Sequence, residues 1–170
     1  CSTPSVVWRP RLSLSARQRI VVANNPAAFV AAYGPGVFVA PHAYGGQNLS
    51  NANLDQSTLT GADLSAANLT NAGLGNSTLT NANLSGANLT NVNLSFSNLT
   101  NANLSGAVVT GAHFYDTTSR GFTRGQLEST ASYQAKDLQG IQLGFNDLTG
   151  WDFSHQDLAG ADLARSNLTN

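Results

Sequence analysis

Few side chains in this sequence are of the types that carry out acid–base, nucleophilic or metal chemistry. The sequence has three histidines, His42, His113 and His155, and a single cysteine, Cys1. The histidines lie in separate segments with no carboxylate or cysteine at ligand spacing, so we expect no metal site. Cys1 is remote from every histidine, which argues against a Cys/His nucleophilic pair. No catalytic, cofactor-binding or metal-binding residue is therefore predicted, and we expect a protein that is not an enzyme.

The acidic residues do not converge on one place either. The main repeat, residues 47–116, contains Asp55 and Asp63 and ends at Asp116. The formal net charge of the chain is −1. The sequence contains no glycine-rich phosphate-binding motif. Later aspartates precede a leucine or phenylalanine and are expected to point outward: Asp137, Asp147, Asp152, Asp157 and Asp162. Binding of nucleic acid is therefore not expected.

The elements that position these side chains are organised by a five-residue repeat. Leucine recurs at every fifth position, with a small residue two positions before most of the leucines. The leucines of the main array are Leu49, Leu54, Leu59, Leu64, Leu69, Leu74, Leu79, Leu84, Leu89, Leu94, Leu99 and Leu104, followed by Val109 and Phe114. Self-similarity at a fixed period indicates a solenoid.

A period of five fits neither a helix nor a flat strand. On an α-helix the leucines would scatter around the axis, and on a strand they would alternate between two faces. Asn or Gly mostly occupies the position two after each leucine, and these residues tolerate the positive φ of tight turns. The chain is therefore predicted to turn a corner once in every unit.

A longer period sets the number of corners. In the small-residue position, Ser57, Ser77 and Ser97 are the only serines of the array, and they lie twenty residues apart. One side of the coil therefore differs from the other three, which predicts four units to a turn.

Alanine, Asn or Asp, leucine and two further residues form a unit that resembles the signature of pentapeptide-repeat proteins. The resemblance covers the main array and a second block near the C-terminus. It implies an all-β fold, a right-handed quadrilateral parallel β-helix whose leucines and small residues point inward. The fold alone does not specify a function.

Four segments are expected. Residues 1–46 form a non-repeat cap with a short helix at residues 25–34 and a brief strand at 36–41; residues 47–116 form the main β-helix; residues 117–135 form a helical insert; and residues 136–170 form a second repeat block. A solenoid needs such a cap because its open end exposes apolar side chains. The second block ends in mid-coil at Asn170, which is expected if the sequence is a fragment.

Thr123 and Gln126 form a capping box, which predicts one short helix that leaves the coil at a corner. Leu127 and Ala131 would form its apolar stripe. This run resembles an insert of secreted pentapeptide-repeat proteins of planctomycete-like bacteria, although Gly125 and Glu128 depart from that pattern. In the second block, Trp151 is large for a small-residue position, so either the coil widens there or the ring turns out over the helix.

Outward Asn, Ser and Thr residues should stack in ladders of like residues that bond to one another. Three functions remain open. The first is a structural or interaction module of an exported bacterial protein, which presents flat polar faces to an unknown protein or surface glycan. The second is gyrase inhibition by DNA mimicry, which requires a continuous acidic surface. The third is a repeat domain of a larger protein.

The resemblance to secreted proteins implies an exported or cell-surface location, with a cytoplasmic one as the alternative. Cys1 would fit a lipidated N-terminus, but an arbitrary start within a longer protein is the favoured interpretation. No run approaches the ~20 apolar residues of a membrane span. The ligand and the oligomeric state do not follow from the sequence.

Overall fold

The computed structural model describes residues 44–169. Cys1, His42, Asn170 and the helix and strand expected at residues 25–34 and 36–41 lie outside the described residues. Among the described residues no helix is long and apolar enough to cross a membrane.

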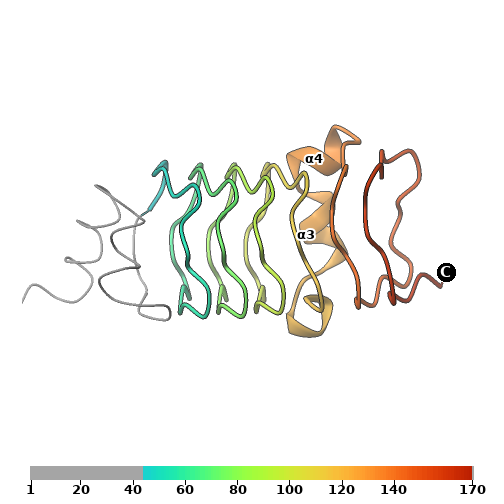
Figure 1. Ribbon diagram of the computed structural model, residues 1–170, viewed down its shortest axis with the longest axis horizontal. Coiled ribbons are helices and arrows are strands. Elements are labelled where there is room, and N and C mark those ends of the chain that lie inside the picture. The colour runs from blue at the N-terminus through green and yellow to red at the C-terminus, as the bar shows by residue number, and fades with distance from the viewer. Residues whose placement is uncertain (1–43, 170) are drawn as a thin grey trace, which may run out of the picture.

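The described chain winds into coils that stack along one axis (Figure 1). Parallel backbone bridges join Asn48 to Asn68 and Asn68 to Asn88, so one turn of the main array takes 20 residues. The Leu49 amide, for example, donates to the Asn68 carbonyl at 2.7 Å. The period predicted from the serines is therefore confirmed.

Each coil has four walls, named here by their bridged residues. Wall A carries Asn48, Asn68, Asn88 and Val108, wall B carries Asn53, Gly73, Asn93 and His113, wall C carries Thr58, Thr78 and Asn98, and wall D carries Asp63, Asn83 and Asn103. Beyond the helices, the bridges resume as Asp137–Asp157, His113–Gln142–Asp162 and Asp147–Asn167. Each bridge is a single residue pair, because a wall is too short between two corners to form a longer strand.

The leucines line the interior, as the sequence predicts. Leu64 and Leu84 are 0% exposed and Leu104 is 1% exposed. Ala62 and Ala82 are also buried, which lets the chain bend closely around the leucines. Burial of each leucine contributes roughly 2 kcal/mol.

The corners adopt the positive φ expected of their residue types. Asn71 and Asn91 have φ of 58° and 55°. The same conformation is imposed on residues that do not favour it, among them Ala66 at 52° and Phe96 at 62°. The hydrogen bonds between coils hold the corner geometry even where the side chain opposes it.

A column of buried polar side chains runs up one corner of the core. The Ser77 and Ser97 hydroxyls donate to the Leu54 and Leu74 carbonyls at 2.8 and 2.5 Å, and each accepts an amide from the coil before. Thr117 and Asn146 are buried higher in the same column. The serines that mark the odd side of the repeat thus form hydrogen bonds between coils.

Asn146 is the most connected member of this column. Its side-chain oxygen accepts the Thr117 and Thr118 amides at 2.8 and 2.9 Å, and its nitrogen donates to the Phe114 carbonyl at 2.6 Å and to the Leu143 carbonyl at 2.9 Å. Thr117 and Asn146 are 29 residues apart, so this coil is longer than the others. The additional residues form helices.

These helices are η1 (Thr118–Arg120), α3 (Arg124–Glu128) and α4 (Ala131–Gln134). The predicted capping box is present: the Gln126 amide donates to Thr123 Oγ1, and the Thr123 amide donates to Gln126 Oε1. The expectation of one helix was wrong. The Thr130 side chain accepts the Tyr133 amide and begins a second helix there.

The helix α3 does not leave the coil at a corner, contrary to expectation. Figure 1 shows α3 between neighbouring coils. The Leu99 amide donates to the Arg120 carbonyl, and the Gly106 amide donates to the Ser129 carbonyl. Gln126 Nε2 donates to the Leu99 and Ala102 carbonyls, both at 2.8 Å. The segment takes the place of walls C and D of one coil, and these bonds satisfy several of the backbone groups that a normal coil would have satisfied.

Apolar side chains of this segment complete the core. Phe122 is 2% exposed and Leu127 is 1% exposed, whereas Ala131 is half-buried. The Phe122 ring stacks on Phe114 with centroids 4.5 Å apart. The Trp151 ring lies against Phe122 at 5.6 Å, so it covers the end of this cluster.

The expected hydroxyl ladders do not bond to one another in the main array. Thr70 Oγ1 donates to Asn68 Oδ1 at 2.7 Å, and Thr90 Oγ1 donates to Asn88 Oδ1 at 2.6 Å, two residues back in the same coil. Coils are about 4.8 Å apart, so short hydroxyl side chains seldom meet between coils; Thr149 Oγ1 and Thr169 Oγ1 of the second block do, at 3.4 Å. Longer amides do reach: Asn103 Nδ2 donates to Asn83 Oδ1 at 3.2 Å.

Replacement of Leu84 by Ala should lower the free energy of unfolding by about 2–5 kcal/mol, because it opens a cavity in a core that cannot collapse around it. Val108→Ala is the control, since Val108 is 37% exposed. Urea unfolding followed by circular dichroism measures both variants. Equal losses for the two would contradict the inward placement of the leucines.

Replacement of Asn146 by Leu should cost about 2–4 kcal/mol, because the Thr117 and Thr118 amides and the Phe114 carbonyl lose a buried partner. Asn88→Leu on the exposed wall should change stability little. Chemical denaturation of both proteins is the measurement. A neutral effect of Asn146→Leu would show that water satisfies these groups.

Candidate functional site

The residues singled out from the sequence are not brought together. His113 lies on wall B with its ring 6.2 Å from Tyr115, and His155 is exposed at a corner with φ of 64°. Asp137 and Asp157 are bridged on wall A, as expected. The described residues hold no group of three or more His, Cys, Asp or Glu side chains that could bind a metal ion.

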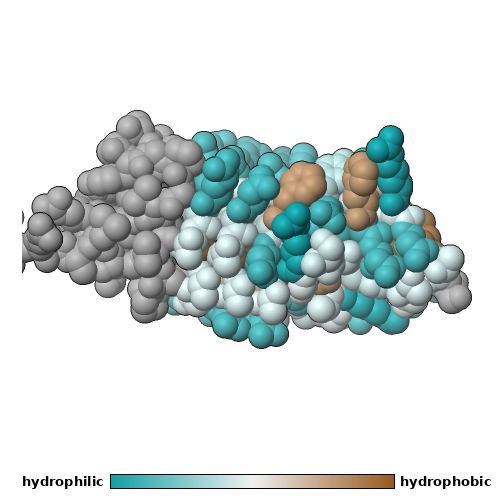
Figure 2. Space-filling view, turned by 90° about the horizontal axis from the view of Figure 1, so that it is seen from below, coloured by the Kyte–Doolittle hydropathy of each residue, from teal (hydrophilic) through white to brown (hydrophobic). Residues whose placement is uncertain are grey.

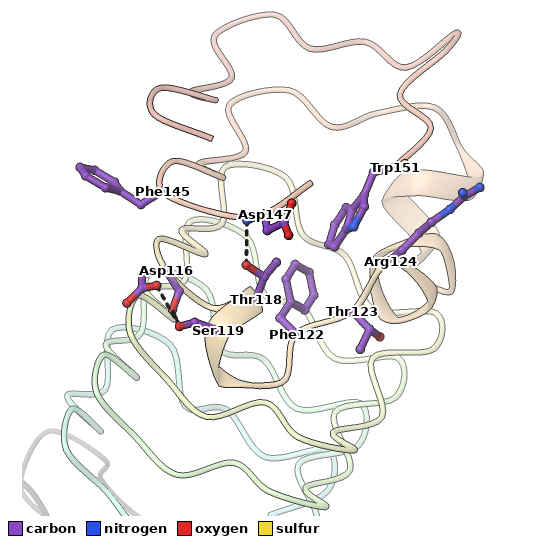
Figure 3. Close-up of a pocket in the computed structure, with 9 residues that line it drawn as sticks. All are labelled: Asp116, Thr118, Ser119, Phe122, Thr123, Arg124, Phe145, Asp147 and Trp151. Atoms are coloured by element: carbon purple, nitrogen blue, oxygen red, sulfur yellow. Dashed lines mark hydrogen bonds between the residues drawn. The ribbon is translucent and has the colours of Figure 1, made fainter. Parts of the chain in front are cut away.

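A cleft opens where η1 and the start of α3 meet the next coil (Figure 3). Its volume is about 470 Å³. It is lined by Asp116, Thr118, Ser119, Phe122, Thr123, Arg124, Phe145, Asp147 and Trp151. The repeat pattern does not predict this cleft, although Trp151 is large for a small-residue position.

The cleft exists because the helices interrupt the bridges of wall C. The described bridges of this wall stop at Asn98 and start again at Asp147. Individual hydrogen bonds join the two sides of this break, called here the seam. The Asp147 amide donates to Thr118 Oγ1 at 2.9 Å, and Arg124 Nη1 donates to the Gly150 carbonyl at 2.7 Å. These bonds and the contact of Trp151 with Phe122 fix the two sides in place.

Arg124 is bound to its own chain through Nε and Nη1. Its Nε donates to Glu128 Oε1 at 2.6 Å, and the hydrogen bond to Glu128 raises the pKa of the guanidinium. Figure 3 shows its side chain directed away from the interior of the cleft. Arg124 therefore braces one wall and offers little charge to a ligand.

Asp147 remains an ionised carboxylate. Its Oδ1 accepts Thr149 Oγ1 at 2.5 Å, the Thr149 amide at 3.1 Å and Asn167 Nδ2 at 3.3 Å. The hydrogen bond from the Thr149 side chain is the main reason why the pKa of Asp147 is lowered. In Figure 3 the carboxylate is turned toward Trp151.

Two exposed phenylalanines stand on the corner beside the cleft. Phe96 is 44% exposed and Phe145 is 51% exposed, each at φ of 62°. Each has a guanidinium over its ring: Arg120 at 6.0 Å from Phe96 and Arg165 at 5.2 Å from Phe145. Figure 2 shows two apolar side chains, each beside a strongly hydrophilic one, on a mostly polar surface.

On the neighbouring wall, Tyr115 ties three coils together. Its hydroxyl lies 2.8 Å from Gln142 Oε1 and donates to Asp162 Oδ2 at 2.7 Å. Gly144 makes room for the ring, because a Cβ there would lie 2.6 Å from Tyr115 Cε1. The hydrogen bond to Asp162 and burial raise the pKa of Tyr115 to about 12.

Alkaline titration should therefore show that Tyr115 ionises late. The absorbance difference between wild type and Tyr115→Phe should have its midpoint near pH 12, and Asp162→Asn should move that midpoint down. Because the folded pKa exceeds the usual 10, the stability that this group contributes is complete below pH 10 and is lost as the pH rises toward 12. Asp157→Asn on wall A is the control; a midpoint near 10 in wild type would contradict the hydrogen bond.

Comparison with solved structures returns several repeat proteins at low overall superposition. A pentapeptide repeat protein from the Arabidopsis thaliana thylakoid lumen is 19% identical with a TM-score of 0.42, over 80% of this chain and 66% of that one. One from Nostoc PCC 7120 is 32% identical with a TM-score of 0.47, over 62% and 83%. The plasmid-mediated fluoroquinolone resistance protein QnrB1 is 20% identical with a TM-score of 0.32, over 68% and 64%. This chain thus spans slightly less than two thirds of the Arabidopsis protein and of QnrB1.

No curated protein sequence matches the chain. The family model for pentapeptide repeats matches it in 8 copies, over residues 48–86, 77–118 and 137–170. The matched residues are those of the coils, and the α3–α4 region lies between the second and third matched ranges. The four-walled stack is the right-handed quadrilateral β-helix of that family. The chain belongs to the pentapeptide-repeat family.

Proposed function

We propose that this protein is a non-catalytic interaction module that presents flat Asn, Ser and Thr faces to a partner protein or surface glycan. The proposal rests on the hydrogen bonds that join outward polar side chains of successive coils. On wall D, Asn103 Nδ2 donates to Asn83 Oδ1, and Asn83 Nδ2 donates to Asp63 Oδ1 at 3.4 Å. These hydrogen bonds fix the amides at the coil spacing, so the wall offers a pre-ordered lattice of donors and acceptors.

The proposal that the protein is not catalytic rests on the hydrogen bonds and the pKa values of its carboxylates. Asp63 accepts Ser65 Oγ at 2.6 Å, and the bond lowers the pKa of Asp63, as Thr149 does for Asp147. Groups held ionised by neighbouring hydroxyls suit neither a general acid nor a base near neutral pH. Export from a bacterial cell is part of the proposal, supported by the resemblance of the helical run to secreted proteins.

The helical residues 117–135 are proposed to be an insertion between two repeat blocks, 47–116 and 136–170. Two observations support this division. The coil that holds the helices spans 29 residues from Thr117 to Asn146, where other coils need 20. The family model also leaves residues 119–136 unmatched.

Charge placed on the flat faces tests the interaction. The double variant Asn83→Lys/Asn103→Lys alters wall D, and the matched Asn68→Lys/Asn88→Lys alters wall A; each pair holds one half-buried and one exposed residue. Co-sedimentation with bacterial envelopes, peptidoglycan, chitin and cellulose measures binding. We expect at least one wild-type interaction that one pair weakens about tenfold, ~1.4 kcal/mol.

Two results would count against the proposal. If both variants bind as well as wild type, the flat faces are not the recognition surface. If the protein inhibits DNA supercoiling by gyrase, the DNA-mimic alternative replaces it. We expect no inhibition, because Asp55, Asp63 and Asp116 do not make a continuous acidic surface.

A further inference from the structure

The cleft beside η1 combines aromatic walls with an uncompensated carboxylate. Ion pairs of the described residues join Arg120 to Asp116 at 3.5 Å and Arg124 to Glu128 at 2.6 Å. Asp147 has no cationic partner among these residues, and its accepted hydrogen bonds fall on Oδ1. The cleft therefore carries a net negative charge at Asp147.

The apolar part of the cleft lies across from this carboxylate. Figure 3 shows Trp151 and Phe122 on the side toward which the Asp147 carboxylate is turned. Trp151 is half-buried, so part of its ring faces the cleft, whereas Phe122 is 2% exposed and supports it from below. The two rings meet at 61°, which gives the wall a fixed shape.

The cleft is prepared in advance for a small ligand. Three features hold its two sides: the Thr118–Asp147 hydrogen bond, the two amides bound to Asn146 and the Arg124–Gly150 hydrogen bond. Its volume of about 470 Å³ lies within the range of small-molecule sites. A ligand would not need to reorganise the chain.

We propose that this cleft binds an organic ammonium ion, with its charge against the Asp147 carboxylate and its apolar groups against the Trp151 ring. Aromatic faces and a carboxylate together attract such cations. An anionic ligand is disfavoured because Arg120 and Arg124 are already paired with carboxylates and the Arg165 guanidinium lies over the Phe145 ring. The site lies at the break in wall C, away from the wall A and wall D residues that test the proposed interaction, so its failure would leave that function untouched.

The test is a titration of the full chain, labelled with ¹⁵N, with choline and with its neutral carbon isostere dimethylbutanol. The amides of Thr118, Thr123 and Asp147 report on the cleft, and the remaining amides report on the fold. Choline should shift the cleft amides with a dissociation constant in the millimolar range. Dimethylbutanol, glucose, acetate and Ca²⁺ should not shift them.

Asp147→Asn keeps the size of the side chain and removes its charge, so it should weaken choline binding at least tenfold with other amides unchanged. Asp157→Asn on wall A is the matched control and should bind as wild type does. Trp151→Leu should weaken binding in the same way. Trp151→Leu can also disturb packing. If its spectrum changes throughout the protein, the Asp147→Asn variant alone decides the test.

Organic ammonium groups occur on free amines, on protein lysines and on lipid headgroups. N-acetyl-lysine amide and phosphatidylcholine vesicles are therefore compared with free choline. Stronger binding of the lysine derivative identifies a protein side chain as the ligand, retention on vesicles identifies a headgroup, and binding of free choline alone identifies a soluble amine; each supports the proposal. Absence of cleft shifts at 100 mM choline, equal shifts with dimethylbutanol, or unchanged binding by Asp147→Asn would each overturn it.

Discussion

The structure depends on the backbone hydrogen bonds that join each coil to the next while the leucines close the space inside. The Leu49 amide reaches the Asn68 carbonyl at 2.7 Å, and the Leu84 amide reaches the Asn103 carbonyl at 2.8 Å. Neither interaction suffices alone. The bonds fix the corners, and the corners turn the leucines of the main array inward, where their burial offsets the entropy lost by ordering an otherwise polar chain.

The same constraint explains how helices fit inside a stack of coils. A coil that is interrupted leaves amides and carbonyls of its neighbour without partners, at a cost that a buried site does not tolerate. Gln126 and Asn146 satisfy these groups with their side chains, and Phe122 and Leu127 fill the core. The helices therefore interrupt the bridges of wall C, but the core beneath them stays filled.

The surface follows from this arrangement. Along the walls, several hydroxyls bond to Asn or Asp oxygens two residues back, and selected amides bond from coil to coil. The neighbouring hydroxyls lower the pKa values of Asp63 and Asp147, so both carboxylates are ionised near neutral pH. At the seam, by contrast, Asp147, Trp151 and Phe145 come together from a coil that meets helices instead of another wall.

The sequence by itself determined the features that repeat. Its five-residue period, its Asn and Gly corners and the serines twenty apart predict a four-walled coil with buried leucines, because each feature depends on neighbours at a fixed spacing. It also predicts the capping box of Thr123 and Gln126, which is local. Only the tertiary structure decided how the unique segment joins the stack. Thr118 and Asp147 are 29 residues apart, and Phe122 meets Trp151 across the same break. No period relates such pairs, so their contact depends on the helices being held within the coil.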